Sequence, residues 1–389
     1  MRVGIDYTSA ATQREGIGRN TRELVRHMLS EPDHPDLHLM YTHQGPIPAV
    51  DALAVNERVR VHRIPVSARV ALAAWHKLRL PVPIEALIGP VHVFHGPDFT
   101  IPPCLVAAGV VTVHDLSFLT RPQDAHPAQL RFLESVVPRS IDRARVIVAI
   151  SESTKHDLMM RMGVRPHRIR VVPTAVAGDF RRVEDQTVLD SVRVRLSLPK
   201  EFVLSVGAIH PRKNLGGLAL AAAIAGRSRG RPINVVHAGR EAWLAERVYA
   251  DVRDSGVPVR FLGHVDEATL RVLYSLASAL AFPSYVEGSA LPVLEAFACG
   301  CPVLTSTTSA TAEVAGSAAV LANPHDPEEL AHGLLRILDN AELRSELRQH
   351  GLDRTRQFSW ARSAVAVLNI YREVVRGDSV PREDMPHNR

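Results

Sequence analysis

Short runs of β-branched and other apolar residues alternate with longer stretches of helical periodicity, and this alternation constrains the fold more than any other feature. In the first half of the chain, strands are predicted at residues 2–6, 37–41, 59–64, 91–94, 110–113, 146–150 and 169–172. Helices are predicted between them, most clearly at residues 19–29, 129–141 and 151–162. Strands that alternate with helices form parallel sheets that helices cover on both faces.

The same alternation restarts in the second half. Strands are predicted at residues 202–206, 233–238, 259–262, 280–282, 302–304 and 318–321, and helices from about residue 214 and at 291–298 and 328–338. The predicted fold is therefore α/β, with two Rossmann-like, doubly wound parallel-sheet domains that face a cleft. We expect the carboxyl ends of both sheets to face that cleft, because ligands of such sheets bind at this edge.

The length of 389 residues fits two or three domains of about 150 residues each. Residues 1–178 are predicted to form the first domain and residues 201–357 the second, with a linker at 179–200. Residues 358–376 have helical periodicity and are predicted to cross back to the first domain. Residues 377–389, with two prolines and mixed charge, are predicted to be a loose tail.

Composition excludes several classes of protein. Hydrophobic residues make up 46% of the chain and charged residues 22%, which is typical of a globular protein and not of a disordered or fibrous one. No run approaches the roughly 20 apolar residues of a membrane-spanning helix, and residues 1–6 resemble a first strand more than a leader. We therefore expect a soluble, cytoplasmic protein. Three cysteines are too few for a disulfide framework, and Cys299 and Cys301 are interpreted as packed residues and not as a metal or redox site.

The excess positive charge lies in the first half of the chain. Residues 1–178 hold 21 basic and 16 acidic residues, whereas residues 179–389 hold 25 of each. Such charge attracts phosphates or an anionic membrane, but no basic stretch carries the interleaved aromatic residues of a nucleic-acid platform. Residues 70–80 place Trp75, Lys77 and Arg79 in an apolar segment. This segment predicts either peripheral contact with the inner face of an anionic membrane or an ordinary packing helix with Trp75 buried.

The most specific string in the chain runs from Tyr285 to Gly300, and in it seven residues separate Glu287 from Glu295. Glu287 follows a predicted strand, and Glu295 lies in the first turns of a predicted helix, whose free N–H groups can receive a phosphate or a sugar hydroxyl. Carboxylates accept hydrogen bonds from vicinal sugar hydroxyls, so two of them suit a ligand with two sugar rings. The alternative is that Glu287 caps the helix and Glu295 is solvated.

A second string follows the first predicted strand of the second half. Gly207 begins a turn there, and Arg212 and Lys213 precede Asn214 at the predicted start of a helix. Together with the positive end of the helix dipole, the two cations could neutralise a diphosphate. The alternative is a solvated Arg-Lys pair in a loop. Lys213 is one of only four lysines in a chain whose 46 basic residues are otherwise arginine, which favours a function for it.

Four shorter strings accompany these two: Gly16-Ile17-Gly18-Arg19, His95-Gly96-Pro97-Asp98, Val113-His114-Asp115 and Ile150-Ser151-Glu152-Ser153-Thr154. Combined with Pro211-Arg212-Lys213-Asn214 and the string that contains both glutamates, they cover nearly the whole chain. The combination resembles the retaining nucleotide-sugar glycosyltransferases of GT-B architecture that carry an E-x7-E motif, which are family 4-like and mannosyltransferase-like.

The resemblance implies a role for each of these residues. Glu287 would contact the donor sugar, and Glu295 would contact the ribose hydroxyls. Arg212 and Lys213 would hold the diphosphate, and the loop with Gly16 and Gly18 would approach it from the first, acceptor-side domain. The rest of the donor site would consist of Gly207, Ser289, Ala290 and Leu291.

Three positions depart from the family pattern. Ser289-Ala290 stands where the family often has Phe-Gly, Thr174-Ala175 stands where it often has Asn-Gly, and His210 stands where an acidic residue commonly precedes Pro-Arg-Lys. The first departure alters the loop beside the donor sugar, so the identity of the donor does not carry over. None of the three removes a cation or a carboxylate that transfer requires.

Residues that follow strands in the first half supply the remaining candidates. The resemblance places His114 at the junction of donor and acceptor, as a catalytic residue beside Glu287, Arg212 and Lys213. The alternative is a histidine that Asp115 or the backbone satisfies. His95 and Asp98, at another strand end, are candidates for the acceptor side.

The resemblance therefore implies a retaining hexosyltransferase that moves a hexose from a nucleoside-diphosphate sugar to a hydroxyl of a glycan or lipid-linked acceptor of the cell envelope. GDP-mannose is the first expectation for the donor and a UDP-sugar the second. No metal or other cofactor is expected, because Arg212, Lys213 and the helix dipole can replace a divalent cation. The alternatives are a nucleotide-sugar epimerase of the same fold and a noncatalytic sugar-nucleotide sensor. A dehydrogenase is disfavoured, because Thr21 stands where a dinucleotide-binding loop needs its third glycine.

Overall fold

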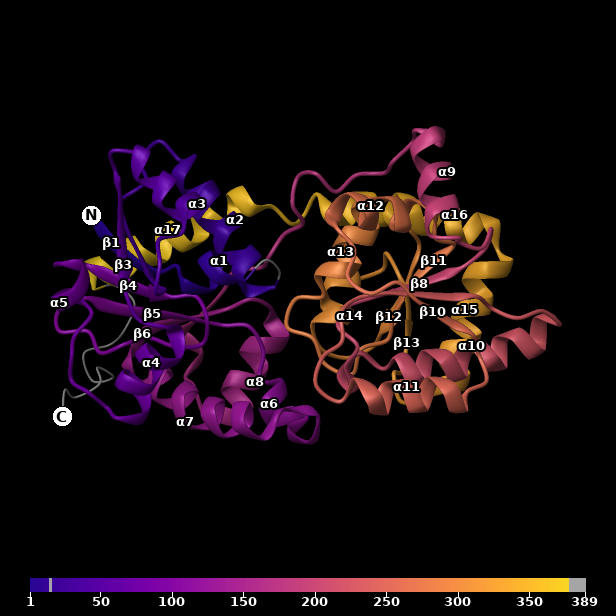
Figure 1. The fold of residues 1–389 in the computed structure, drawn as a ribbon, viewed down its shortest axis with the longest axis horizontal. Coiled ribbons are helices and arrows are strands. Elements are labelled where there is room, and N and C mark those ends of the chain that lie inside the picture. The colour runs from indigo at the N-terminus through magenta and orange to yellow at the C-terminus, as the bar shows by residue number, and fades with distance from the viewer. Residues whose placement is uncertain (14–15, 378–389) are drawn as a thin grey trace. The chain divides into compact units, whose positions relative to one another are not determined.

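The computed structural model describes residues 1–13 and 16–377, which divide into two compact units (Figure 1). The first unit contains Met1–Leu119, Pro127–Thr174 and the chain from Trp360 on. The second unit contains Thr120–His126 and Ala175–Ser359. Each unit is built on a parallel sheet with helices on both faces, so the predicted α/β fold with two doubly wound parallel sheets is confirmed.

In the described part of the first unit, the sheet has seven parallel strands in the order β3-β2-β1-β4-β5-β6-β7. The strands are β1 (Arg2–Asp6), β2 (Asp36–Thr42), β3 (Val59–Ile64), β4 (Val93–Gly96), β5 (Ala108–Val113), β6 (Ala144–Ala149) and β7 (Ile169–Val171). After β1 the chain adds strands toward one edge of the sheet, and after β4 it adds them toward the other. This reversal between β1 and β4 is a topological switch point, where sheets of this kind bind ligands.

Helices cover both faces of the first sheet (Figure 1). They are α1 (Thr8–Thr12), α2 (Ile17–Leu29), α3 (Pro48–Asp51), α4 (Ala68–Leu72), α5 (Glu85–Ile88), α6 (Ser117–Thr120), α7 (Pro127–Arg143), α8 (Glu152–Met162) and α17 (Trp360–Arg376). On one face Ile5 packs with Val25 of α2 and Val367 of α17. On the other face Val111 packs with Val137 of α7. Side chains that alternate along a strand therefore enter two different cores.

In the described part of the second unit, the sheet has six parallel strands in the order β10-β9-β8-β11-β12-β13. The strands are β8 (Val203–Val206), β9 (Val235–Ala238), β10 (Val259–Phe261), β11 (Ala279–Phe282), β12 (Val303–Ser306) and β13 (Val320–Ala322). The switch point of this sheet lies between β8 and β11. The loops that follow these two strands are therefore neighbours, although the strands are distant in the sequence.

Helices also cover both faces of the second sheet. They are α9 (Gln186–Arg195), α10 (Leu215–Arg229), α11 (Ala245–Asp254), α12 (Glu267–Leu276), α13 (Leu291–Ala298), α14 (Ser309–Ala315), α15 (Pro327–Asp339) and α16 (Ala341–Thr355). Leu204 packs with Leu273 of α12 on one face, and Val203 packs with Leu218 of α10 on the other. Figure 1 shows α12 and α13 on one side of this sheet and α10 and α11 on the other.

One difference from the predicted elements concerns the glycine loop near the N-terminus. The helix predicted at residues 19–29 starts earlier, because α2 already begins at Ile17, and Gly18, which was expected in a loop, lies buried in its first turn. A Cβ atom at position 18 would lie 2.3 Å from the carbonyl oxygen of Gln13, so the glycine lets the chain before α2 pass close to the helix.

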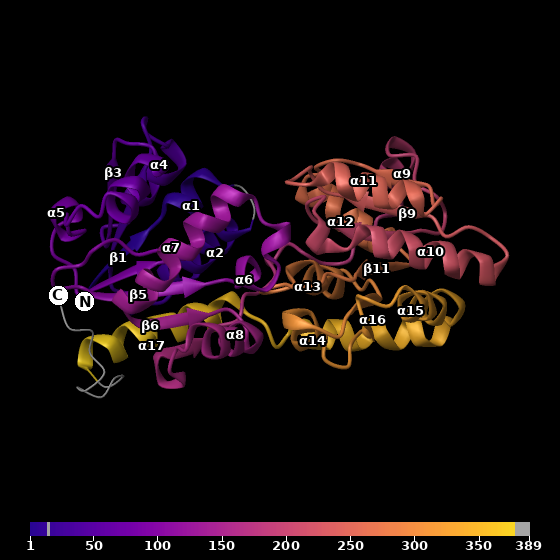
Figure 2. The same ribbon diagram turned by 90° about the horizontal axis from the view of Figure 1, so that it is seen from below.

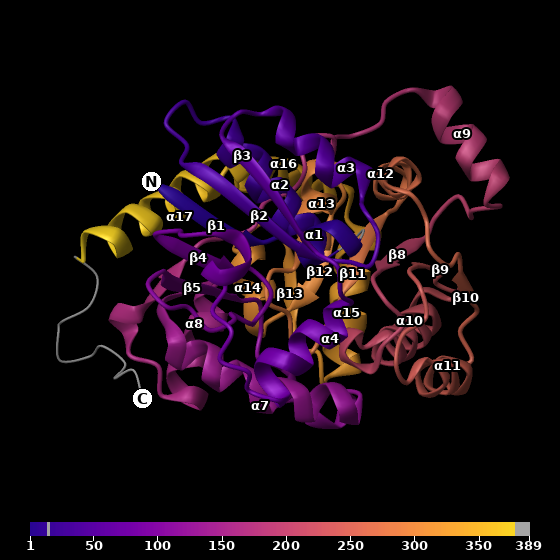
Figure 3. The same cartoon turned by 60° about the vertical axis from the view of Figure 1, so that its left-hand side comes forward.

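Two segments differ from the predicted domain bounds. Residues 120–126 group with the second unit. The stretch at 179–200 contains α9 (Figure 3). This helix packs on α12 through Val192. The helix predicted at the C-terminus is α17, which belongs to the first unit (Figure 2). It packs on α2 there. The predicted tail lies outside the described residues from residue 378 on.

Two further predictions concern the membrane and the cysteines. None of the described helices is both long enough and apolar enough to span a membrane. Cys299 and Cys301 are free and buried between the end of α13 and the start of β12, where burial raises the pKa of each thiol to about 12. This confirms the interpretation of both as packed residues.

Candidate active site

The loop that follows β8 carries the two predicted cations. A one-turn 3-10 helix, Pro211–Lys213, places Arg212 and Lys213 immediately before α10. Gly207 begins the loop with a φ of 133°, a conformation that side chains disfavour. A Cβ atom there would lie 3.3 Å from Cε of Lys213, so the glycine leaves room for the stem of the lysine side chain.

Asn214 ties this loop to its neighbours. It has a left-handed backbone, with a φ of 57°, and its side-chain amide donates to the carbonyl oxygens of Pro283 at 3.1 Å and Pro324 at 2.7 Å. The amide of Tyr285 also donates to the carbonyl oxygen of Arg212 at 2.9 Å. The loops after β8, β11 and β13 therefore hold one another in place. Asn214 is part of a motif found in the sequence, but this structural role was not predicted for it.

Glu287, in the loop that follows β11, contacts both cations. Its Oε1 accepts a hydrogen bond from Nζ of Lys213 at 2.6 Å, and its Oε2 lies 3.0 Å from a guanidinium nitrogen of Arg212. The guanidinium also donates to the carbonyl oxygen of Val286 at 2.5 Å. The backbone amide of Glu287 donates to the hydroxyl of Ser309 at 3.0 Å, a partner that no sequence signal indicated. The structure therefore brings together three of the four residues predicted to be catalytic.

The charge state of this trio follows from its surroundings. Burial by itself raises the pKa of Glu287, but the charges of Arg212 and Lys213 and the hydrogen bond from Lys213 outweigh it and lower the pKa to about 2. The carboxylate is therefore ionised at neutral pH and acts only as a hydrogen-bond acceptor. Two cations and one anion leave a net positive charge at the switch point of the second sheet.

Both alternatives considered for the glutamates are wrong. Glu287 does not cap α13, since the N-cap position belongs to Ala290, which has a left-handed backbone and no side-chain cap. Glu295 is not solvated, because only 5% of it is exposed. One oxygen of Glu295 accepts a hydrogen bond from the hydroxyl of Tyr274 at 3.0 Å. No sequence motif had indicated Tyr274 as this partner.

The N-terminal turn of α13 follows Ala290 directly. Ser289 and Leu291 flank this residue, and both are partly exposed. The first amides of a helix bear partial positive charge. In this turn Pro292 has no N–H and the amide of Val293 donates to the carbonyl oxygen of Ala290 at 2.9 Å, so the amide of Leu291 is the group that can receive an anion. The predicted donor residues of this loop thus lie in the same unit as Glu287, Arg212 and Lys213.

The glycines predicted to approach the diphosphate lie in the first unit. Gly16 is the N-cap of α2 and has a φ of 60°, a left-handed conformation that favours glycine. Gly18 is buried in the helix, so it has no surface to offer to a ligand. Of the two, only Gly16 keeps an exposed backbone.

His114 is buried directly after β5. Its ring makes a hydrogen bond to the backbone, as in the alternative interpretation of this residue. Its Nε2 donates to the carbonyl oxygen of Pro97 at 2.8 Å, while Asp115 accepts from the amide of Ser117 instead of contacting the ring. Burial is the main cause that lowers the pKa of His114, so the neutral ring leaves Nδ1 as an acceptor.

His95 does not suit the acceptor role predicted for it. It is fully buried, with Nδ1 2.7 Å from the hydroxyl of Tyr371 and Nε2 2.8 Å from the hydroxyl of Thr112. Both ring nitrogens are therefore occupied inside the first unit. Asp98, in contrast, is only partly buried and lines a cavity. Two residues of one predicted motif thus have different environments, because one lies inside β4 and the other beyond its end.

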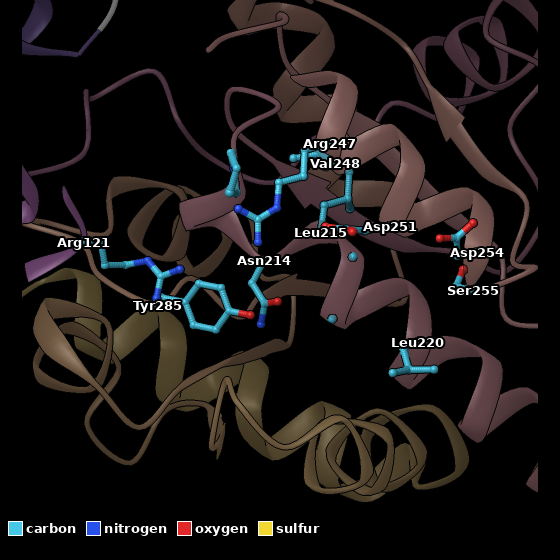
Figure 4. A pocket seen from close by; sticks show the side chains of 13 residues that line it. Arg121, Asn214, Leu215, Leu220, Arg247, Val248, Asp251, Asp254, Ser255 and Tyr285 are labelled. Carbon is cyan, nitrogen blue, oxygen red and sulfur yellow. The ribbon is translucent and has the colours of Figure 1, made fainter. Parts of the chain in front are cut away.

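The second unit contains a pocket of about 370 Å³, and Tyr285 is one of the residues that line it (Figure 4). Arg121 stacks on the ring of Tyr285, 4.1 Å from its centroid, and Arg247 points toward Asn214 across the pocket. None of the predicted site residues lines this pocket. In the described residues, no group of three or more His, Cys, Asp or Glu side chains could hold a metal ion.

Comparisons with known proteins define the class to which this fold and site belong. Residues 14–179 match the family described as Glycosyltransferase Family 4, and residues 190–354 match the family described as Glycosyl transferases group 1. The chain therefore belongs to the group 1 glycosyltransferases, with a family 4 first half, and it is an enzyme of GT-B fold.

Individual relatives agree with this class. O-antigen chain mannosyltransferase B of Escherichia coli is 27% identical over 376 residues, which cover 92% of this chain and 96% of that protein. Sucrose-phosphate synthase of Thermosynechococcus elongatus has a similar fold, with a TM-score of 0.72 at 18% identity over 97% of this chain and 100% of the other. HepE of Anabaena, solved with UDP and glucose, has a TM-score of 0.68 at 15% identity, over 95% of this chain and 98% of the other.

Proposed function

We propose that this glycosyltransferase moves a mannosyl residue from a nucleoside-diphosphate mannose to a hydroxyl of a saccharide acceptor, with retention of the anomeric configuration. The observation that carries the proposal is the contact of Arg212 and Lys213 with Glu287 at the switch point of the second sheet. Two cations fixed beside an ionised carboxylate offer phosphate oxygens and sugar hydroxyls the partners that each requires.

In the proposed reaction, the diphosphate lies against Arg212, Lys213 and the amide of Leu291 at the start of α13. Glu287 accepts a hydrogen bond from a hydroxyl of the donor sugar. The bond between the anomeric carbon and the phosphate oxygen breaks, and its electron pair goes to the phosphate. The acceptor oxygen bonds to the anomeric carbon from the same face, and its proton passes to the leaving phosphate. Cations that are already held in place stabilise the developing charge without reorganisation. Removal of a single donor of this kind typically raises the activation free energy by roughly 3–4 kcal/mol.

Two findings support the choice of donor. The relative from Escherichia coli is named a mannosyltransferase, which supports mannose as the sugar. HepE was solved with UDP and glucose, which keeps a UDP-sugar as the second candidate after GDP-mannose. Glu295, as the proposed partner of the ribose hydroxyls, serves either nucleotide, so it supports a nucleotide donor without selecting the base.

For the acceptor we propose a glycan or lipid-linked saccharide of the cell envelope, in keeping with the O-antigen relative. The proposed place of action is the cytoplasmic side of the membrane, with peripheral contact through the first unit. Trp75 takes no part in such contact, because it is buried and its indole N–H donates to the carbonyl oxygen of Val82 at 3.0 Å. Exposed apolar residues elsewhere support the contact better, namely Leu105 and Val106, which are 70% and 72% exposed.

Glu85 holds this apolar pair in place. Its carboxylate accepts hydrogen bonds from the amides of Leu105, Val106 and Ala107 at 2.8–3.0 Å. Burial raises the pKa of Glu85, but these amide hydrogen bonds outweigh it and lower the pKa overall. A turn fixed by an ionised carboxylate can present two apolar side chains in one orientation. Such a pair suits insertion into the interface of a bilayer.

The experiment that tests the proposed function is a donor panel on the whole chain. GDP-mannose, GDP-fucose, UDP-glucose and UDP-galactose are incubated with methyl α-D-mannopyranoside and with a mannose-terminated lipid-linked glycan, and products are identified by mass spectrometry. We expect a mannosylated product with GDP-mannose and none with the other donors. Conversion of the donor to another sugar nucleotide without an acceptor would indicate the epimerase instead. Binding of a donor without any product would indicate the noncatalytic sensor.

A further inference from the structure

Residues 120–126 form a short segment that belongs to the second unit, although the chain on either side of it belongs to the first. Its middle is a one-turn 3-10 helix, Pro122–Asp124. A segment of seven residues has no core of its own, so its contacts with the second unit must offset the conformational entropy that is lost when it is ordered. These contacts therefore indicate what the segment does.

Arg121 joins the segment to the loop that follows β11. Its guanidinium stacks on the ring of Tyr285, 4.1 Å from the ring centroid (Figure 4), and its Nε donates to the carboxylate of Asp124 at 2.5 Å. Only 2% of Asp124 is exposed, so this ion pair is anchored on the inside of the segment. A guanidinium fixed by a carboxylate presents its planar face to an aromatic ring in one orientation.

Tyr285 transmits this contact to the loops that hold Arg212 and Glu287. Its amide donates to the carbonyl oxygen of Arg212 at 2.9 Å, and it precedes Glu287 by two residues. The ring of His325 also stacks on the ring of Tyr285, with 4.7 Å between the centroids. Because Arg121 and His325 both pack on this ring, the backbone that leads to Glu287 has little freedom to move.

His210 joins the segment to the loop that follows β8. Its Nδ1 accepts a hydrogen bond from the amide of Arg212 at 3.2 Å, which caps the one-turn helix Pro211–Lys213. The ring also makes a hydrogen bond with the backbone of Asp124, and burial lowers the pKa of His210, which favours the neutral form. Since Nδ1 accepts, the proton of the neutral ring lies on Nε2 and can be donated to a carbonyl oxygen. An acidic residue at this position could supply the cap, but it would have no proton to donate at neutral pH.

The two connections meet at the backbone of Arg212. His210 binds its amide, Tyr285 binds its carbonyl oxygen, and both of these residues contact the segment. The alternative is that the contacts only anchor the segment. His126 already provides an anchor at the end of the segment, because its ring lies 4.5 Å from that of Trp243. The convergence of the other contacts on one cationic residue favours a role in the site.

We propose that residues 120–126 act as a clamp on the two loops of the candidate active site, in which Arg121 and His210 are positioning residues. They hold the backbone of Arg212 and the approach to Glu287, and they do not touch the ligand. The effect of the clamp on donor binding and transfer rests on the proposed function, whereas its effect on the two loops does not.

The first measurement follows the loops without any ligand, by hydrogen exchange and mass spectrometry on the whole chain. Arg121→Lys keeps a cation for Asp124 but lacks the planar face, and Tyr285→Leu removes the ring. Both should raise the exchange rate of residues 283–291 about tenfold, because the loop opens more often. Tyr285→Phe keeps the ring and should exchange like the wild type. Gln123→Ala, at an exposed residue of the same segment, is the matched control and should also leave exchange unchanged.

His210→Asn separates the two hydrogen bonds of the histidine. Asparagine can still accept from the amide of Arg212 as a cap, but its shorter side chain loses the contact with the backbone of Asp124. Exchange of residues 209–214 should therefore rise several-fold in this variant.

The second measurement is made in the transferase assay. Arg121→Lys and His210→Asn should each lower kcat about tenfold and leave the acceptor KM within about twofold, because both misplace groups that hold the diphosphate. The double variant should lose little more than the worse single variant, since both changes act through Arg212. Melting temperatures within a few degrees of the wild type show that the variants fold.

Exchange at the wild-type rate in the Arg121, Tyr285 and His210 variants would overturn the clamp. Faster exchange with an unchanged kcat would also overturn it, because the contacts would then only anchor the segment. If the wild type neither binds GDP nor transfers mannose while the variants exchange faster, the proposed function fails and the clamp on the two loops stands.

Discussion

The ammonium group of Lys213 lies 2.6 Å from a carboxylate oxygen of Glu287, although 74 positions separate the two residues in the sequence. The contact exists because β8 and β11 are paired neighbours, so the loops that follow them meet at one edge of the sheet. The lysine satisfies a buried carboxylate, and in the proposed function it also provides a cation for a phosphate. Predictions about the donor therefore begin with this pair.

Replacement of Lys213 by alanine should weaken GDP binding by about 10- to 100-fold, because a charge-assisted hydrogen bond contributes about 1.5–3 kcal/mol. Isothermal titration with GDP measures the effect. Lys200→Ala, at an exposed lysine of the same unit, is the control and should bind GDP like the wild type. Equal affinity in the Lys213 variant and the control would remove the lysine from the donor site.

The depressed pKa of Glu287 should make stability depend on pH in a defined window. The pKa lies at about 2 in the folded protein, below its ordinary value of 4.5, so the ionised form favours the folded state. This stabilisation, on the order of 3 kcal/mol, is complete above pH 4.5 and is lost as the pH falls toward 2. Melting temperatures between pH 7 and pH 2.5 should fall less steeply for Glu287→Gln than for the wild type. Glu328→Gln, at an exposed position, is the control and should follow the wild-type curve. Parallel curves for all three proteins would contradict the lowered pKa of Glu287.

Glu295→Gln should weaken the binding of GDP about tenfold and leave the binding of 2′,3′-dideoxy-GDP nearly unchanged, because the lost contact is to ribose hydroxyls. Glutamine keeps a partner for the buried hydroxyl of Tyr274, so the fold is retained. Tyr274→Phe should weaken GDP binding only a few-fold, since it removes a group that positions Glu295 and does not touch the ligand. An equal loss of affinity for both nucleotides would place Glu295 outside the ribose site.

His114→Ala should lower turnover at least tenfold while GDP affinity stays within about twofold, because the neutral histidine is proposed to orient the donor sugar and not the nucleotide. Rates are measured with GDP-mannose in excess chelator, and the anomeric coupling of the product is read by NMR. His156→Ala, at an exposed histidine, is the control. An inverted linkage, or activity that chelator abolishes and manganese restores, would refute the proposed mechanism.

Membrane contact should depend on the exposed pair Leu105 and Val106. Co-sedimentation with vesicles that contain 30% phosphatidylglycerol should capture the wild type at low salt and less of it at high salt, because basic residues supply part of the attraction. Leu105→Ser combined with Val106→Ser should reduce capture several-fold. Val194→Ser, at a residue of the second unit that is 78% exposed, should not. Absence of binding to both anionic and neutral vesicles would count against the contact.

The sequence predicted most of the strands and helices, because a strand that is buried on both faces is a nearly continuous run of apolar residues. The helix predicted at residues 291–298 is α13 with the same ends, and β3 also has its predicted bounds. The error at Gly18 arose because a glycine in the first turn of a helix and a glycine in a turn look alike in sequence. Their difference lies in the close approach of Gln13, which is a tertiary contact.

The sequence by itself determined that Glu287, Arg212, Lys213 and Asp98 follow strands, since a strand and its end are local features. Only the tertiary structure decided which of these residues meet. It paired Glu287 with both cations, occupied both nitrogens of His95 and buried Trp75. The physical reason is that strand order brings distant loops together, and the strength of a charge or a hydrogen bond depends on the neighbours and the burial that this order creates.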